Sequence, residues 1–370
     1  MTLVDVFKYL HTMVTKEGSD LFFSVGAPVT MKRHGRFIPF NAPVLENGSV
    51  KQLAYQLMNQ KQAAEFERDL EMNLGIGVPE IGRFRVNVFY QRGEVAMVVR
   101  HINNVIPDIV ELGLPEKLRE LVMLDRGLVL VIGAAGSGKS TTLASMIDYR
   151  NQHHAGHIIC IEDPIEFLHH HKKSIVNQRE VGLDTHSFEE ALRNVLRETP
   201  DVIMIGEIRD RLTMQQALRY SETGHLVLAT LHATNTVHAV ERMLNLFPEE
   251  ARKQLLGDVA MNLQGVIGQR LIAGKTKSRL PAVELLLRTP YITDLISRGD
   301  LHDLRTAITR GREQGLQTFD QHLFELFEQG AISLDEALRN ADSRTDLLLR
   351  TRLERGFSAE ESEMKVLRDS

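Results

Sequence analysis

The stretch VLVIGAAGSGKSTTLASMI, residues 129–147, joins a run of apolar residues to a segment with the composition of a helix. Between them lies a glycine-rich loop that fits the pattern G-x-x-x-x-G-K-[ST]. In such a loop, backbone N–H groups and the start of the following helix surround phosphates, the lysine neutralises the β and γ oxygens, and the hydroxyl holds Mg²⁺. We therefore expect ATP and Mg²⁺ to bind at Gly133, Ala134, Ala135, Gly136, Ser137, Gly138, Lys139, Ser140 and Thr141, with Ser140 on the metal.

Length and composition indicate a two-domain globular protein. The 370 residues exceed what one hydrophobic core usually organises, and no apolar run is long enough to span a bilayer. The single cysteine, Cys160, excludes internal disulfides and a cysteine-based zinc site, and its place in HIICIED predicts a buried strand residue. A net charge of −5 gives no global basic field that would attract nucleic acid.

After residue 107 strand-like and helix-like segments alternate, which predicts a parallel sheet with helices on its faces. Two strands end in acidic residues: HIICIEDPIEF places Glu162 and Glu166 near the carboxyl edge of the sheet, and DVIMIGEIRD places Glu207 there. We expect Glu207 to orient Mg²⁺ or polarise the attacking water, and Glu166 to be the general base. A solvated acidic loop is the alternative interpretation of residues 162–166.

A further strand, HLVLAT, begins at His225 and leads to His232. His232 falls at the same ligand edge, where an imidazole can hydrogen-bond the γ-phosphate or the Glu207 carboxylate and respond to the bound nucleotide. His225 is a weaker candidate for the nucleotide site, and a structural role is the alternative for both. The run at residues 169–171 is expected to be a solvated loop, because consecutive histidines do not converge on one metal.

Residues 3–102 have the pattern of a compact α+β domain. A helix is expected in LVDVFKYLHTMV, and one long helix over residues 49–70 with Ser49 as its cap. The strands GRFRVNVFYQ and EVAMVVRHI are joined at Arg92 and Gly93, which predicts a hairpin. Several arginines, Arg100 among them, lie along these strands. They form either a solvated sheet face or a group that reaches the nucleotide of a neighbouring subunit.

Four motifs in this order resemble the secretion ATPase superfamily, and specifically the PilT and PilU retraction ATPases of type IV pili. They are the Walker A stretch GAAGSGKSTT, the Asp box IEDPIEF, the Walker B stretch IGEIRD and the His box TGHLVLATLHATN. The resemblance covers nearly the whole chain to about residue 345. It implies an α/β chain with a PAS-like N-terminal α+β domain over 1–104, a RecA-like P-loop ATPase domain over 105–345, and a flexible C-terminal extension over 346–370.

The resemblance also implies an assembly and a place in the cell. Such a protein is expected to be a cytoplasmic homohexamer, peripheral at the inner-membrane base of the pilus machine, where it contacts the platform protein and no nucleic acid. In this family, strand arginines of the first domain complete the nucleotide site. Carried over to this sequence, that role falls to Arg92 and Arg100.

Two departures narrow the expected role. One cysteine cannot build the four-cysteine zinc module of assembly and secretion motors, so the extension motor is disfavoured. The A-I-R-N-L-I run of PilT-type motors is replaced by a sequence with Tyr291, Thr293 and Asp294 in place of its alanine, arginine and asparagine, and the chain has a longer end. Both features are similar to PilU and predict an accessory motor that acts with a PilT-type ATPase. The alternatives are an independent PilT-type motor, a nucleotide-binding scaffold that regulates a partner, and a motor on nucleic acid.

Overall fold

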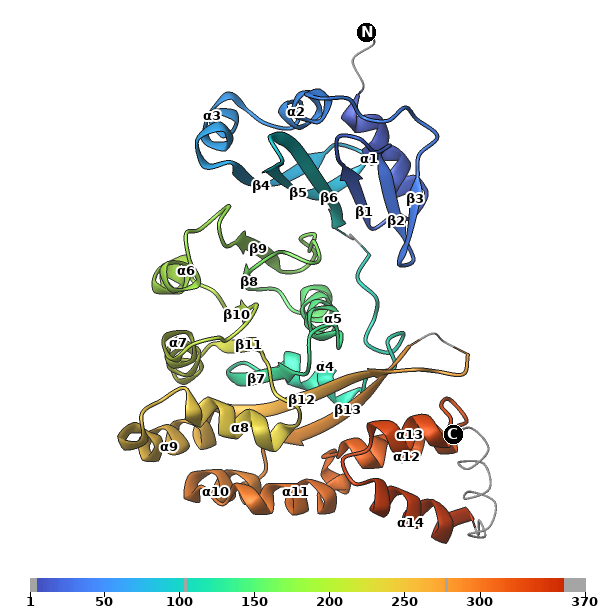
Figure 1. Cartoon of the computed structure of the whole chain (residues 1–370). Coiled ribbons are helices and arrows are strands. Elements are labelled where there is room, and N and C mark those ends of the chain that lie inside the picture. Colours follow the sequence, from blue (N-terminus) through green and yellow to red (C-terminus); the bar gives the residue numbers. More distant parts are fainter. Residues whose placement is uncertain (1–4, 103–104, 277–278, 356–370) are drawn as a thin grey trace. The chain divides into compact units, whose positions relative to one another are not determined.

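The computed structural model describes residues 5–102, 105–276 and 279–355, and contains two units, each with its own sheet (Figure 1). The first unit is Met1–Val105 together with residues 163–169 and 179–187, and the second holds the remainder. This arrangement confirms the expected α/β chain with an α+β domain at its start. Among the described residues, no helix is both long and apolar enough to cross a bilayer.

The first unit is built on an antiparallel sheet with the strand order β3-β2-β1-β6-β5-β4, and its three helices lie over one face of that sheet (Figure 1). The strands are β1 (Asp20–Phe23), β2 (Thr30–Arg33), β3 (Arg36–Pro39), β4 (Glu71–Val78), β5 (Gly82–Gln91) and β6 (Glu94–Ile102). The helices are α1 (Val6–Thr15), α2 (Ser49–Tyr55) and α3 (Gln60–Asp69). Buried apolar residues of α1, β1, β5 and β6 form its core, with Phe66 and Phe84 fully enclosed.

The expected single helix over residues 49–70 is wrong. The chain forms two helices there, because the Asn59 side chain accepts a hydrogen bond from the Gln62 N–H and Gln62 bonds back to the Asn59 N–H, a capping box that starts α3. Ser49 is not the cap of α2 either. That position is Gly48, in the left-handed conformation, and the Ser49 hydroxyl donates to the Glu46 carbonyl instead.

The second unit has a seven-stranded sheet with the order β13-β12-β7-β11-β10-β8-β9. Strands β12, β7, β11, β10 and β8 are parallel to one another, and β13 is antiparallel to β12. The bounds are β7 (Gly127–Ile132), β8 (His157–Glu162), β9 (Ile175–Glu180), β10 (Val202–Ile205), β11 (Leu226–Leu231), β12 (Leu263–Ile272) and β13 (Leu280–Leu287). All residues of β7, β10 and β11 are buried, as expected of central parallel strands covered on both faces.

Helices cover this sheet and continue beyond it toward the end of the chain (Figure 1). The helices before and between the strands are α4 (Lys117–Val122), α5 (Lys139–His153), α6 (Phe188–Val195), α7 (Arg211–Glu222), α8 (Thr236–Asn245) and α9 (Arg252–Asn262). The C-terminal helices are α10 (Pro290–Arg298), α11 (Leu301–Arg310), α12 (Phe319–Glu328), α13 (Leu334–Asn340) and α14 (Arg344–Arg355). Short 3-10 segments are η1 (Leu196–Glu198), η2 (Glu249–Ala251) and η3 (Arg312–Gln314).

The stretch expected to be a flexible extension, residues 346–370, begins instead as a helix. Most of α14 lies within it, and Leu347 and Thr351 are buried. Leu347 packs in a small apolar cluster with Phe319, Leu323 and Phe324 of α12, which explains why this segment is ordered as a helix. Residues 356–370, on which the expectation of flexibility also falls, lie outside the described residues.

Candidate active site

Four neighbouring strands of the second unit end at the same edge of the sheet. Strand β7 runs into the glycine-rich loop, β11 into His232, β10 into Glu207, and β8 ends at Glu162. In the sheet these strands stand in the order β7-β11-β10-β8 and are parallel. Motifs that are far apart in the sequence therefore meet at one carboxyl edge, which is where open parallel sheets bind their ligands.

The loop after β7 has the backbone of a phosphate-binding loop. Gly133, Gly136 and Gly138 have φ angles of +153°, +75° and +92°, a region that side chains disfavour. Lys139 begins α5, and its Nζ donates to the Gly133 and Ala134 carbonyls, each at 2.9 Å. Burial lowers the pKa of Lys139, and the nearby Glu207 carboxylate opposes this shift. The lysine is thus held over its own loop.

Glu207 is held between two cationic or proton-donating side chains. Its Oε2 lies 2.7 Å from Nε of Arg209, and its Oε1 lies 3.0 Å from Nε2 of His232. The backbone supports this geometry, since the Ile208 N–H donates to the Thr230 carbonyl of β11 at 2.9 Å. The contact expected between His232 and Glu207 is therefore present. Arg209 was not among the expected site residues, although it lies two positions after the glutamate in IGEIRD.

The two glutamates of the Asp box have different surroundings. Glu162 is buried at the end of β8 and accepts a hydrogen bond from Nε2 of Gln178 at 2.9 Å. Glu166 is exposed, in the segment 163–169 that belongs to the first unit. Within one unit the structure brings Glu207, but not Glu166, to the phosphate loop. Cys160 in the same strand is fully buried as expected, and burial raises the pKa of its thiol.

The structure corrects the placement of His225. It precedes β11, whose Leu226 pairs with Gly127 at the start of β7, so it lies at the amino end of strands whose carboxyl ends carry the phosphate loop. Its Nδ1 lies 3.2 Å from both the Tyr220 carbonyl and the Thr223 hydroxyl. His225 is therefore a structural residue at the C-terminal end of α7 and does not reach the loop of its own chain.

The histidine run also differs from the expected solvated loop. His169 is buried, with a relative exposure of 9%. The Nδ1 of His171 accepts a hydrogen bond from the Val176 N–H at 3.1 Å, so this ring helps to fix the start of β9. His170 and His171 have the exposed side chains that were expected of the run, and only the buried His169 departs from the expectation.

The two arginines carried over from the family differ in their contacts. Arg100, on β6, bonds through Nε to Oδ1 of Asp20 at 2.9 Å, and Asp20 is buried in the neighbouring strand β1. Arg92 is exposed at the turn between β5 and β6, with a φ of +52°. Arg92 is thus at the tip of the hairpin, whereas Arg100 is tied to the sheet of its own unit.

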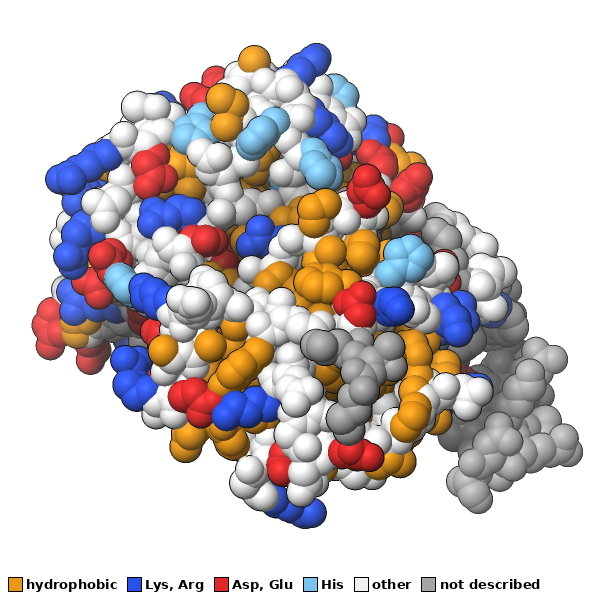
Figure 2. Space-filling view, turned by 90° about the horizontal axis from the view of Figure 1, so that it is seen from above, with side chains coloured by type: hydrophobic (Ala, Val, Ile, Leu, Met, Phe, Trp, Pro, Cys, Tyr) orange, Lys and Arg blue, Asp and Glu red, His pale blue; other side chains and the backbone are white. Residues whose placement is uncertain are grey.

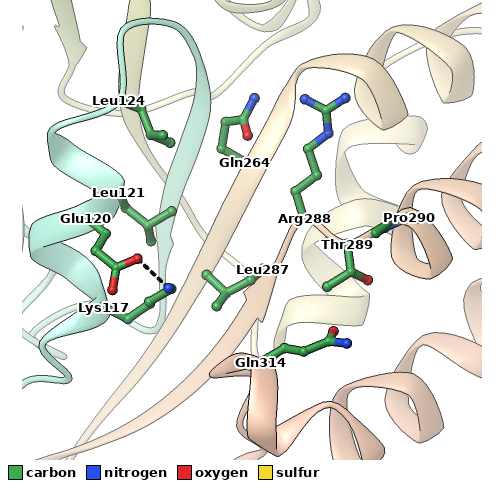
Figure 3. Close-up of a pocket in the computed structure, with 10 residues that line it drawn as sticks. All are labelled: Lys117, Glu120, Leu121, Leu124, Gln264, Leu287, Arg288, Thr289, Pro290 and Gln314. Atoms are coloured by element: carbon green, nitrogen blue, oxygen red, sulfur yellow. Dashed lines mark hydrogen bonds and ion pairs between the residues drawn. The ribbon is translucent and has the colours of Figure 1, made fainter.

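A pocket of about 330 Å³ in the second unit lies apart from the expected site residues (Figure 3). It is bounded by α4, the start of β12 and the passage from β13 into α10, and none of its ten lining residues was expected to bind nucleotide. Figure 3 shows the ion pair between Lys117 and Glu120 at one side and Arg288 at the other. The pocket does not belong to the nucleotide site.

Comparison with known proteins identifies the class of this molecule as a P-loop ATPase. The family model described as "Type II/IV secretion system protein" matches residues 12–339. The chain therefore belongs to the Type II/IV secretion system protein family.

The relatives match along nearly the whole chain. The Type IV pilus ATPase PilU of Pseudomonas aeruginosa is 49% identical over 94% of this chain and 91% of its own length. The type IV pilus retraction ATPase PilT of the same organism is 42% identical, with coverages of 91% and 98%. A crystal structure of the pilus retraction motor PilT with bound ADP has a TM-score of 0.87, with 41% identity over 92% of this chain and 98% of that one. These matches confirm a nucleotide-binding ATPase with a RecA-like domain.

Proposed function

We propose that this protein is an accessory ATPase of type IV pilus retraction that works with a PilT-type ATPase. The observation that carries the proposal is the 49% identity with PilU over 94% of the chain, together with a nucleotide site whose motifs are all intact. In this proposal six copies form a ring in the cytoplasm. The ring lies against the inner membrane at the base of the pilus machine, where it contacts the platform protein.

The phosphate loop carries the binding step of the proposed mechanism. On nucleotide binding, Nζ of Lys139 exchanges the Gly133 and Ala134 carbonyls for the β and γ oxygens of ATP, which bear more negative charge. Oxygen donors suited to Mg²⁺ are at hand in the exposed Ser140 hydroxyl and the Glu207 carboxylate. Bound there, Mg²⁺ supplies positive charge to the phosphates.

The hydrolytic step is assigned to carboxylates and to His232. Glu207 or Glu166 orients the attacking water and takes its proton, and Glu162 shapes the edge of the nucleotide site. Because His232 bonds the Glu207 carboxylate at 3.0 Å, a shift of either side chain on γ-phosphate release is transmitted to the other. His232 thus acts as a sensor of the nucleotide state. The arginines Arg92 and Arg100 complete the site of a neighbouring copy, and Arg92 is the better placed of the two because Arg100 is already bonded to Asp20.

The accessory role rests on helix α10. Tyr291 and Asp294 are exposed on this helix, and Asp294 forms an ion pair with Arg298 one turn later. The acid is therefore compensated within its own helix. Compared with the surface formed by A-I-R-N-L-I, this surface has lost an arginine and gained a tyrosine ring. These two changes matter more than the negative charge of Asp294, which is paired. A partner fitted to the arginine finds no guanidinium at this position.

The face drawn in Figure 2 gives no support to a motor on nucleic acid. On the face drawn in Figure 2, basic and acidic side chains are intermixed around a central group of hydrophobic ones. A nucleic-acid track requires a continuous basic groove, usually with aromatic side chains for stacking.

The informative test is a strain that lacks its PilT-type motor and expresses only this chain. The proposal predicts no twitching motility in that strain. In the strain with both motors, retraction against load should weaken when this chain carries Lys139→Ala. Normal motility with this chain alone would establish an independent retraction motor and refute the accessory role, while the ATPase assignment would stand.

A further inference from the structure

Two consecutive polar residues, Gln269 and Arg270, interrupt the apolar strand β12. Strand β12 lies beside β7, the strand that leads into the phosphate loop, with Gly268 opposite Ile132. Successive side chains of a strand point to opposite faces of the sheet, so these two residues reach different parts of the unit. Neither takes part in the mechanism described above.

Gln269 contacts both ends of the phosphate loop and the helix that follows it. Its backbone carbonyl oxygen lies 2.5 Å from where a Cβ on Gly133 would be, and its side-chain Nε2 lies 2.8 Å from the equivalent point on Gly138. Its Oε1 accepts a hydrogen bond of 2.6 Å from the hydroxyl of Thr142 in α5. Gln269 is 4% exposed and Thr142 is fully buried. The phosphate loop therefore packs directly against Gln269, and this close approach is possible because Gly133 and Gly138 have no side chain.

The side chain of Arg270 lies on the opposite face of the sheet from that of Gln269 and forms hydrogen bonds there. Its Nη2 donates to the Thr234 carbonyl at 3.2 Å and to Oδ1 of Asp342 at 2.6 Å, and its Nη1 donates to the Asn340 carbonyl at 2.6 Å. The guanidinium lies 3.8 Å from the ring centre of Phe319 in α12. Thr234 is two residues after His232, so Arg270 joins the segment that carries His232 to the C-terminal helices.

We propose that Gln269 and Arg270 are positioning residues for ATP hydrolysis, with separate tasks. Gln269 holds the phosphate loop in its nucleotide-binding shape from behind. Arg270 holds the segment 232–235, and through His232 the Glu207 carboxylate, at a fixed position relative to the C-terminal helices. Neither residue touches the nucleotide. Strand β12 thereby links the nucleotide site to the region that contains α12 and α13.

The test compares two variants of the full-length protein, Gln269→Met and Arg270→Met, which keep side-chain length and remove the hydrogen bonds. Gln269→Met removes a buried hydrogen bond that supports the phosphate loop, so it should weaken ADP affinity by about tenfold with little change in kcat. Arg270→Met should instead lower kcat by about tenfold and leave ADP affinity within about threefold of wild type. Calorimetry with ADP and steady-state turnover are measured below the melting temperature of each variant. If Gln269 and Arg270 only stabilised the fold, the loss would not divide in this way between ADP affinity in one variant and kcat in the other.

Arg305→Met is the matched control for Arg270. Arg305 pairs with Asp320 at 3.1 Å and approaches Asp342 within 3.9 Å, in the same acidic cluster, and in the described part of the chain it does not bond to Thr234. It should leave kcat unchanged. Equal losses in Arg305→Met and Arg270→Met would overturn the assignment of Arg270, as would wild-type kcat in Arg270→Met.

Thr142→Val tests the Gln269 contact from the other side and serves if Gln269→Met does not fold. It should weaken ADP affinity to a similar extent, and the double variant should be no weaker than either single variant, because both remove one interaction. Independent, additive losses or unchanged ADP affinity would overturn the proposal for Gln269.

Discussion

In the seven-stranded sheet the functional side chains gather at one edge, whereas in the six-stranded sheet the arginines are dispersed. Parallel strands all end on the same side, so Lys139, Glu207 and His232 converge although they are far apart in sequence. Antiparallel strands end alternately on both sides, and there Arg92 lies at a turn while Arg100 is bonded to Asp20. A site at the edge of a parallel sheet can therefore be predicted from sequence motifs, whereas the motifs of an antiparallel sheet do not show which side chains come together.

The largest expected effect is at the convergent edge. Lys139→Ala should abolish ATP turnover, by a factor of about 100 or more, because it removes the charge that neutralises the phosphates. The fold should survive, because the lysine is half-exposed and bonds only to loop carbonyls. Turnover of the purified variant checks this, with circular dichroism and size as controls for folding. Retained turnover would refute the assignment of the loop.

A smaller effect is expected from the dispersed arginines. Arg92→Ala should lower turnover by about tenfold, and Arg100→Ala by less, because Asp20 already occupies the guanidinium of Arg100. Arg68→Ala, an exposed arginine of the same unit that pairs with Asp69, is the control. Turnover at fixed protein concentration above the assembly range measures all three.

Mixing variants tests whether Arg92 acts between copies. Rings that contain both Arg92→Ala and Lys139→Ala subunits should recover some turnover, because an interface between one of each kind can have one intact site. No recovery in rings shown to be mixed would leave Arg92 as a surface residue.

The smallest expected effect concerns the pH dependence of stability in the second unit. Burial raises the pKa of Glu284 to about 7, with the charge of Asp342 adding to this; the Thr236 N–H and Arg270 oppose it. Burial lowers the pKa of His322 to about 4, and its Nδ1 accepts from the Val283 N–H. Between about pH 4.5 and 6.5 the folded state holds an extra proton at Glu284 and lacks one at His322, so the two effects on stability have opposite signs.

Removing one group should expose the other. In Glu284→Gln, stability should rise with pH from 4.5 to 6.5 by up to about 1.4 kcal/mol per pH unit, because His322 then acts alone. In His322→Gln it should fall with pH over the same range. Melting temperatures across pH for the two variants and wild type measure this, and parallel curves for all three would contradict the assigned pKa shifts.

The sequence predicted elements best where local chemistry decided them. The bounds expected for β5 and β6 agree with the structure, because alternating apolar residues flank the turn at Arg92 and Gly93. Strand β4 was missed, since Gly75 and Gly77 weaken its strand pattern. Gln269 and Arg270 could not be recognised from sequence, because their importance depends on β12 lying beside β7, a pairing of strands more than a hundred residues apart. His225 was kept as a weaker candidate for the nucleotide site although it begins the strand that leads to His232, and the structure places it at the amino end of that strand.

The most direct test of the account is the comparison of ATP binding and ATP turnover in Glu207→Gln. The account places Glu207 at the hydrolytic step, so this variant should bind ATP within about threefold of wild type and lose turnover by about 100-fold or more. The exposed Glu241 of α8 provides a control, Glu241→Gln, which should behave as wild type. Wild-type turnover in Glu207→Gln would contradict the claim that the carboxyl edge of the parallel sheet, with Glu207 held by Arg209 and His232, is where ATP is hydrolysed.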